Sequence, residues 1–244
     1  LNLNPDDAFS DPTFFKSEAD LKLYCNGFYA TLPVMGSSSD NNSDNMVPRD
    51  KDKFLSGQYI VPIVSNDPDG EENDEWIWKN ERSVNYFLQR YQRAAAADEV
   101  KNKYAAEARF FRALYFWQKV KRYGDVPWFT TDLNETSPEL YLPRTPRKQV
   151  MDSVLLDLNF AVANLPEPAN AEKGRLHKYA AAALKARICL WEGTYRKYHN
   201  SGDDQPMIRE AANAAELVIN SSAYDLYSTG NPTTDYYNLF IQEE

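Results

Sequence analysis

The chain has 244 residues, of which 43% are apolar, and this is enough to bury one large hydrophobic core or two small ones. Its formal net charge of -9 argues against a nucleic-acid ligand, because phosphate binding needs clustered Lys and Arg. No apolar run is long enough to cross a bilayer, and residues 1–5 lack the basic and apolar segments of a signal peptide. The 16 Tyr and 5 Trp suit a wet binding surface, because their rings combine an apolar face with a polar group.

Two helices are expected on either side of a long irregular segment. Ser17, followed three residues later by Asp20, is typical of a helix N-cap, and apolar residues then recur at helical spacing up to Pro33. Residues 34–75 contain polar runs of Ser, Asn and Asp and predict a loop, and a loop of that length is usually functional or disordered. Helical periodicity returns over residues 75–95.

The third helix has the clearest boundaries in the sequence. It begins near Asp98 and reaches Tyr123, with Gly124 at the C-cap and Pro127 beyond it. Two apolar stripes run along it, so we expect it to pack against neighbours on two sides.

Three more helices follow the third. Thr145 is the expected N-cap of the fourth helix, which Pro166 ends. The fifth covers residues 176–193 and contains several alanines, which let a neighbouring helix approach closely. The sixth begins after Pro206.

These elements predict a mostly all-α fold class. The helical pairs over residues 98–222 are expected to stack as antiparallel hairpins of tetratricopeptide-like type, with long irregular loops and few strands. The sequence halts at residues 235–244 on an aromatic cluster with no closing element. We therefore expect residues 1–244 to form a single helical domain that is truncated at its C-terminus.

The Cys, His and acidic residues do not favour a metal site or a cofactor. Cys25 and Cys189 lie far apart, each among the apolar residues of an expected helix, so buried free thiols are expected. His177 and His199 have no partner at metal-ligand spacing. The acidic run 66–75 leaves two interpretations, a calcium site or a solvated loop, and its glycine comes too early for an EF-hand.

The sequence contains no motif that predicts an enzyme. It has no nucleophile elbow, phosphate loop or dinucleotide fingerprint. Glu107 and Asp125 could form a charged cluster with Arg109 and Arg122. Ion pairs along a helix and a capping Asp explain these four residues more simply.

The expected ligand contacts lie around the start of the second helix, at Trp76 and Trp78 with Asn66, Asn73 and Asn80. A sugar ring has an apolar C–H face and a rim of hydroxyls, so aromatic plates with Asn side chains suit it. The competing interpretation is that one or both Trp anchor the helix in the core. Because the two Trp are two residues apart on an expected helix, they should point in different directions.

Several blocks of the sequence match the sequence motifs of one protein family. They are residues 14–29, 107–116, 122–127, 143–146, 156–166 and 174–190. Together they resemble the SusD/RagB family of outer-membrane nutrient-binding lipoproteins, and they follow that family's order along nearly the whole chain. Members of the family are longer, and their second half supplies much of the ligand-binding surface.

The resemblance implies a tetratricopeptide-like scaffold that caps a SusC-like TonB-dependent transporter and delivers glycans to it. It also implies a surface-exposed lipoprotein of the cell outer membrane, which takes part in polysaccharide utilisation and contacts the membrane only through a lipidated cysteine upstream of Leu1. The leading hypothesis is therefore noncatalytic binding of extracellular glycans. A peptide-binding RagB-like protein and a helical protein-interaction scaffold without a small ligand stay open as alternatives.

Overall fold

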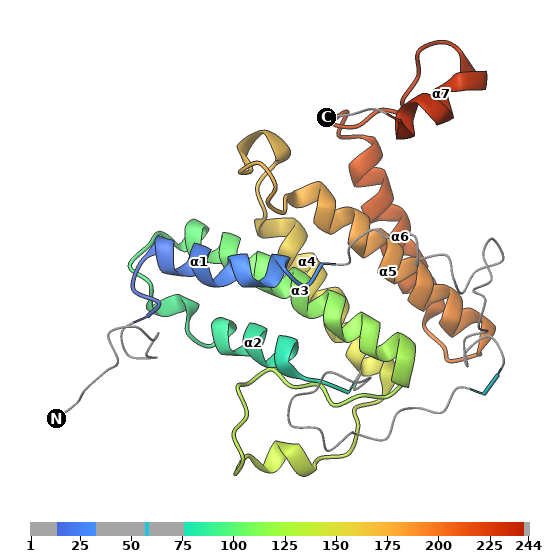
Figure 1. Ribbon diagram of the computed structural model, residues 1–244. Coiled ribbons are helices and arrows are strands. Elements are labelled where there is room, and N and C mark those ends of the chain that lie inside the picture. Colours follow the sequence, from blue (N-terminus) through green and yellow to red (C-terminus); the bar gives the residue numbers. More distant parts are fainter. Residues whose placement is uncertain (1–13, 33–56, 59–75, 242–244) are drawn as a thin grey trace. The chain divides into compact units, whose positions relative to one another are not determined.

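The computed structural model divides into two compact units, which are described separately below. The first unit covers residues 1–150 and the second covers residues 151–244. The structure describes residues 14–32, 57–58 and 76–241 (Figure 1). The expectation of a single domain stays a prediction.

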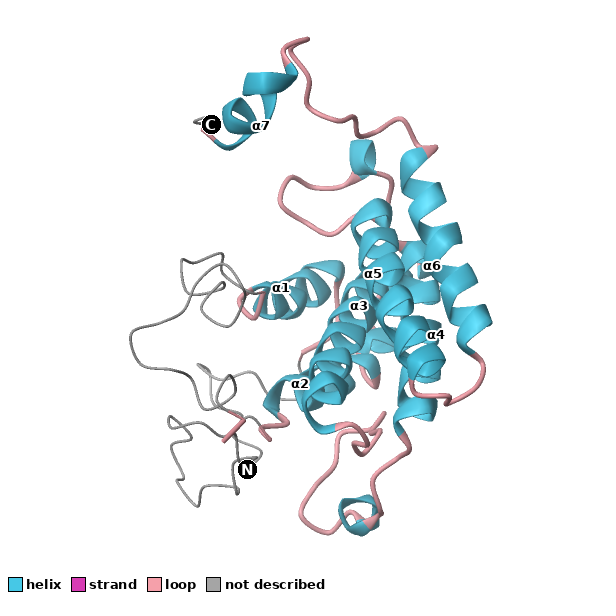
Figure 2. Cartoon of the chain, turned by 90° about the vertical axis from the view of Figure 1, so that its right-hand side faces the viewer, coloured by secondary structure: helices cyan, strands magenta, loops and turns pink. Residues whose placement is uncertain are grey.

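Helices and loops make up the described part of the chain (Figure 2). The α-helices are α1 (Glu18–Tyr29), α2 (Lys79–Leu88), α3 (Asp98–Tyr123), α4 (Arg147–Asn164), α5 (Lys178–Tyr198), α6 (Asp204–Ile219) and α7 (Pro232–Phe240). These residues contain no strand, and an isolated bridge pairs Val126 with Thr145. None of the described helices is both long and apolar enough to cross a membrane. The predicted all-α fold class is confirmed.

The core of the first unit is aromatic and lies between α3 and the two helices that pack against it, α1 and α2. Phe111 of α3 is fully buried, and its ring lies 5.6 Å from that of Phe28 in α1. Phe28 in turn meets Phe87 of α2 edge to face, with ring centroids 6.1 Å apart. Such edge-to-face pairs add to the free energy that burial of the rings supplies. Packing of the third helix on two sides is confirmed.

The signals that mark the ends of α1 and α3 act as the sequence predicts. Ser17 and Asp20 form a capping box, in which the Asp20 N–H donates to Ser17 Oγ at 3.4 Å and the Ser17 N–H donates to Asp20 Oδ2 at 2.9 Å. Gly124 ends α3 with φ +72°, a backbone conformation that glycine adopts without strain. Both helices therefore have ends that are set by local chemistry.

The predicted start of the second helix is wrong. The helix begins at Lys79 rather than near residue 75, and residues 76–78 enter it as non-helical chain. Trp78 occupies the N-cap position without a side-chain cap. A helical path would turn the two neighbouring Trp away from each other, whereas the non-helical path lets both rings pack on the same side of the unit.

Three boundaries in the second unit also differ from prediction. α6 begins at Asp204 rather than after Pro206, because proline is tolerated in the first turn of a helix. α5 begins at Lys178 and continues to Tyr198, five residues beyond the predicted end at Gly193. α7 occupies the aromatic segment for which no closing element was expected, and Asn231 caps it by accepting a hydrogen bond from the Thr233 N–H at 3.3 Å. Gly193 does not end α5, and the aromatic residues after Pro232 form a helix of their own.

Asp125 caps α4 from the loop that follows α3. Its Oδ1 accepts a hydrogen bond from the Arg147 N–H at 2.7 Å. Thr145 is not the helix cap that the sequence predicts. Its N–H donates to the Val126 carbonyl at 3.1 Å and its Oγ1 accepts from the Trp128 N–H at 3.1 Å, so it ties the two ends of the intervening loop together.

Replacing Asp125 by Ala is expected to lower the free energy of unfolding by about 1 kcal/mol, because it leaves the first N–H of α4 without its acceptor. Asp125→Asn keeps an acceptor at the same place and should cost less. Urea unfolding followed by far-UV circular dichroism measures both changes. Equal losses in the two variants would contradict a capping role.

In the second unit, α5 and α6 form an antiparallel hairpin (Figure 1). The two helices approach closely at Gly193, where an added Cβ would lie 2.7 Å from Ile208 Cγ1. Cys189 packs with Met207 in this hairpin, and Leu155 of α4 covers them. A glycine near the C-terminal end of α5 allows this close contact. It lies beyond the alanines that were expected to allow it.

Both cysteines are buried free thiols, as predicted. The Cys25 thiol donates to the Tyr104 carbonyl, with 3.7 Å between sulfur and oxygen. Burial raises the pKa of Cys189 to about 12, so this thiol stays protonated at neutral pH. Neither cysteine has the exposed, electropositive surroundings of a reactive thiol.

Candidate functional site

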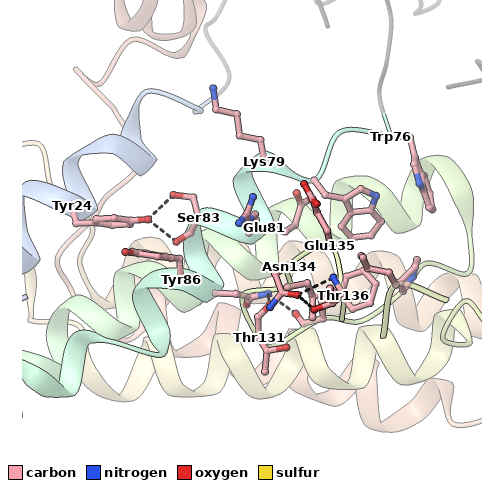
Figure 3. Close-up of a pocket in the computed structure, with 17 residues that line it drawn as sticks. Tyr24, Trp76, Lys79, Glu81, Ser83, Tyr86, Thr131, Asn134, Glu135 and Thr136 are labelled. Carbon is pink, nitrogen blue, oxygen red and sulfur yellow. Dashed lines mark hydrogen bonds between the residues drawn. The ribbon is translucent and has the colours of Figure 1, made fainter. Parts of the chain in front are cut away.

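An open cleft of about 1150 Å³ lies in the first unit beside α2 (Figure 3). Its walls come from α1, from the chain that leads into α2, from α2 itself and from the loop after α3. The lining residues are Tyr24, Trp76, Trp78, Lys79, Glu81, Arg82, Ser83, Asn85, Tyr86, Pro127, Phe129, Thr131, Leu133, Asn134, Glu135, Thr136 and Leu140.

Trp76 and Trp78 together form an aromatic wall at one end of the cleft. Their rings meet edge to face with centroids 5.1 Å apart, and both side chains are half-buried. Trp76 packs on Tyr123 at 4.7 Å, and Trp78 packs on Phe129 at 5.7 Å. The expectation that the two Trp point in different directions is wrong, because neither belongs to the helix. Each ring is anchored by its neighbours and keeps part of its surface open.

Two tyrosines lie at the other end of the cleft, where α1 meets α2 (Figure 3). The rings of Tyr24 and Tyr86 stack with 6.0 Å between centroids and 14° between planes. The Tyr24 hydroxyl donates to the Ser83 carbonyl at 3.2 Å. Burial raises the pKa of Tyr24, so the hydroxyl remains a neutral hydrogen-bonding group.

The loop after α3 forms a polar side of the cleft. Asn85 of α2 holds this loop by donating from Nδ2 to the Phe129 carbonyl at 2.8 Å. Farther along, Asn134 Oδ1 accepts from the Thr136 N–H at 2.9 Å and from the Thr136 hydroxyl at 2.7 Å. Ser137 Oγ accepts from the Asn134 N–H at 2.9 Å. These local bonds present amide and hydroxyl groups on a fixed turn.

The charged residues that line the cleft balance one another, with Lys79 and Arg82 against Glu81 and Glu135. Arg82 Nε lies 2.9 Å from Asp132 Oδ1, and Arg90 approaches the other oxygen of the same carboxylate at 3.6 Å. Lys79 and Glu135 add one exposed charge of each sign. A cleft with little net charge suits a neutral polar ligand better than an ionic one.

The structure places three of the five predicted ligand-binding residues. Trp76 and Trp78 line the cleft, as just described. Asn80 is exposed and lines a neighbouring hollow of about 300 Å³ instead. Asn66 and Asn73 lie outside the described residues, as does the acidic run that contains them.

Most of the cleft comes from residues that the sequence analysis did not select. Tyr24 belongs to the apolar pattern of the first helix, which predicts a core position, and Tyr86 was not part of any pattern that the sequence analysis identified. The polar side comes from residues 129–136. The run of Thr, Asp, Asn and Glu in that segment, placed between two strongly predicted helices, is the signal that could have identified it.

Aromatic walls, amide and hydroxyl groups and balanced charges in an open cleft are the features of a site that binds a polar small ligand. The described residues therefore combine an all-α scaffold with a cleft of this kind. The family model for SusD-like proteins, described as "Starch-binding associating with outer membrane", matches residues 1–190. The chain belongs to this SusD-like family.

Three similar proteins come from two groups of bacteria. SusD-like protein P2 of Formosa agariphila is 26% identical over 98% of this chain and 46% of its own length. Starch-binding protein SusD of Bacteroides thetaiotaomicron is 28% identical over 88% of this chain and 40% of its own length. The crystal structure of a SusD-like protein from Bacteroides fragilis superposes with a TM-score of 0.71 at 27% identity, over 95% of this chain and 43% of that one. The chain thus spans less than half the length of these relatives.

Proposed function

We propose that this protein binds extracellular glycans without catalysing a reaction on them. The observation that carries the proposal is the half-buried pair Trp76 and Trp78 at the edge of an open cleft that also presents hydroxyl and amide groups. Sugar rings pack their C–H faces on such aromatic surfaces and direct their hydroxyls to polar side chains. The similarity to a starch-binding protein of Bacteroides thetaiotaomicron supports the same ligand class.

The noncatalytic part of the proposal is supported by the state of the cleft's carboxylates. A glycosidase needs two carboxyl groups that both reach the scissile bond. Glu81 is 3% exposed and its carboxylate is already engaged in an ion pair with Lys119, which does not suit a catalytic acid or base. Glu135 is exposed and lies on the polar side of the cleft. We infer that the cleft needs neither a catalytic pair nor a cofactor, and EDTA should leave binding unchanged.

The proposed place of action is the bacterial cell surface. The family description, with its association with the outer membrane, supports a surface-exposed lipoprotein of that membrane. In this proposal the protein passes its bound glycan to a SusC-like TonB-dependent transporter. Copurification of such a transporter with tagged protein tests the partner separately from the ligand.

Oligosaccharide binding is the direct test of this function. We expect a panel of neutral oligosaccharides, titrated into the protein by isothermal calorimetry, to contain at least one ligand, and Trp76→Ala to weaken its binding about tenfold through loss of one stacking surface. Trp191→Ala is the matched control, because Trp191 is also half-buried but does not line the cleft, and it should keep the affinity of the unchanged protein.

Failure of this test has a defined meaning. If no oligosaccharide on the panel binds, the glycan assignment is wrong. Peptides then become the ligand class to test, as expected for a RagB-like protein. A transporter that copurifies in the absence of both ligand classes would indicate an interaction scaffold.

A further inference from the structure

A buried ion pair lies directly behind the tryptophan wall of the cleft. Lys119 of α3 and Glu81 of α2 are 8% and 3% exposed, and 3.3 Å separates Lys119 Nζ from Glu81 Oε1. A buried ion pair of this kind is stable only where its contacts compensate for the hydration that both charges lose. The contacts of Lys119 therefore show what the pair holds in place.

Lys119 links the ion pair to the chain that carries the tryptophans. Its Nζ donates to the Ile77 carbonyl at 2.6 Å and lies 4.8 Å from the centroid of the Trp78 ring. A cation at that distance from an indole is attracted by the negative face of the ring. One ammonium group thus contacts both the backbone between the two Trp and the ring of the second Trp.

This contact fixes the backbone between the two Trp, whereas the contacts with Tyr123 and Phe129 fix their rings. Trp78 is the N-cap of α2, and no side chain caps that end of the helix. Glu81 is the third residue of the helix, so its carboxylate also lies near the positive end of the helix dipole. The pair therefore fixes the start of α2 to α3 at the position of the aromatic wall.

One oxygen of this carboxylate is not satisfied. Glu81 Oε2 is buried and has no hydrogen-bond partner, although Glu81 lines both the cleft and the neighbouring smaller hollow. An unpartnered buried carboxylate oxygen is costly while the group is ionised. Burial raises the pKa of Glu81, and the charge of Lys119 opposes that rise only in part.

The other ionisable groups around Glu81 do not replace Lys119 as its partner. Tyr115 of α3 stays neutral, since burial raises its pKa to about 12. Other ionisable side chains line the same two hollows, and they are Tyr24, Lys79, Arg82, Tyr86, Arg122, Tyr123 and Glu135. Among these, Arg82 is paired with Asp132. A change in the ionisation state of Glu81 therefore acts first on its ion-pair partner, Lys119.

We propose that Glu81 and Lys119 are positioning residues for the aromatic wall, and that the ionised Glu81 carboxylate, acting through Lys119, holds Ile77 and Trp78 in the arrangement that receives an oligosaccharide. This inference rests on the proposed function for the identity of the ligand. The positioning itself is a property of the free protein and can be measured without any ligand.

The direction of the pH effect follows from the raised pKa of Glu81. On acidification Glu81 takes up a proton before an ordinary glutamate, whose pKa is 4.5. Neutral Glu81 no longer attracts Lys119, so the ammonium is free to leave the Trp78 ring for water. The stability that this group contributes is fully present below pH 4.5 and is lost as the pH rises through its folded-state pKa. Protonation of Glu81 thus raises the free energy of unfolding, and it also releases Lys119 from the aromatic wall.

The test uses tryptophan fluorescence of the full chain between pH 4 and pH 8. The difference in emission between the unchanged protein and Trp78→Phe isolates the signal of Trp78, and we expect it to change with a midpoint above 4.5. Glu81→Gln should abolish this transition. Glu99→Gln, which removes an exposed carboxylate of α3 that does not line the cleft, should retain it.

A second measurement connects the pair to binding. At pH 7 we expect Glu81→Gln to bind maltoheptaose about tenfold more weakly than the unchanged protein, as for the loss of one charge-assisted contact. Near pH 4.5 the difference should shrink, because Glu81 is then protonated in the unchanged protein. Far-UV circular dichroism and urea unfolding verify that the variant is folded.

The possible outcomes separate the two proposals. A Trp78 transition that persists in Glu81→Gln, or no transition in the unchanged protein, overturns the positioning role whatever binds. A transition without maltoheptaose binding supports the positioning role and counts against a starch-type ligand. Equal maltoheptaose affinities for Glu81→Gln and the unchanged protein at pH 7 overturn the coupling to ligand.

Discussion

Replacing Arg196 by Met is expected to lower the free energy of unfolding by about 3–5 kcal/mol, as for removal of one member of a buried ion pair. The Arg196 guanidinium is buried in the second unit. Its Nε donates to Glu192 Oε1 at 2.7 Å and its Nη2 donates to Asp152 Oδ1 at 2.7 Å. Glu192 is 1% exposed, so its carboxylate cannot regain from water the charge compensation that Arg196 provides.

Arg187→Met on the same helix is the matched control. Arg187 is exposed, so the same change of side chain removes a solvated charge and should alter stability by less than about 0.5 kcal/mol. Urea unfolding at pH 7 measures both variants. Similar losses for Arg187→Met and Arg196→Met would contradict a specific role for the buried network. A rescue by Glu192→Gln in the Arg196→Met background would support it, because that change removes the buried charge.

The sequence predicts best those parts of the fold that local chemistry determines. The C-terminal end of α3 follows from Gly124 and from the apolar stripes that stop at the same place. The start of α1 follows from the capping box of Ser17 and Asp20. The cap of α4 could not be found this way. Asp125 lies on the far side of a loop from the helix that it caps, and only the folded loop brings it to Arg147.

The candidate site could be predicted only in part, for a related reason. Trp76 and Trp78 were recognisable because large aromatic side chains beside polar ones are unusual in a segment with loop composition. Their place in the same cleft could not be predicted, because it depends on a non-helical approach to α2, next to which Trp76 packs on Tyr123 and Trp78 on Phe129. Tyr24 was not predicted as a site residue, because it is one of the apolar residues that recur at helical spacing and are expected in the core. Cleft residues on helices carry the same pattern as core residues.

The residues that line the cleft all belong to the first unit, whereas the Arg196 network belongs to the second. Stability and ligand binding can therefore be probed with different substitutions. If Arg196→Met unfolds the second unit and leaves the emission of Trp76 and Trp78 unchanged, the two units unfold independently. A simultaneous loss of both signals would show that they unfold as one.

The contact between α5 and α6 gives the second large expected effect. Replacing Gly193 by Ala overpacks a close contact at a cost of about 3 kcal/mol, and we expect a net destabilisation of the protein by about 2 kcal/mol. The new Cβ would lie 2.7 Å from Ile208 Cγ1 and 3.0 Å from the Ile208 backbone nitrogen. A side-chain rotation can relieve the first contact, but only a movement of α6 can relieve the second. Alanine's better helix propensity, worth about 1 kcal/mol, offsets part of this cost.

Gly27→Ala separates these two contributions. Gly27 is exposed in α1, and an added Cβ there meets nothing within 4 Å. Only the propensity gain remains, so this variant should be more stable than the unchanged protein by about 0.5–1 kcal/mol. Urea unfolding of both variants gives the comparison directly. A stabilising Gly193→Ala would mean that α6 moves away without cost, and the hairpin would then owe its packing to Met207 and Cys189 rather than to the close approach at this glycine.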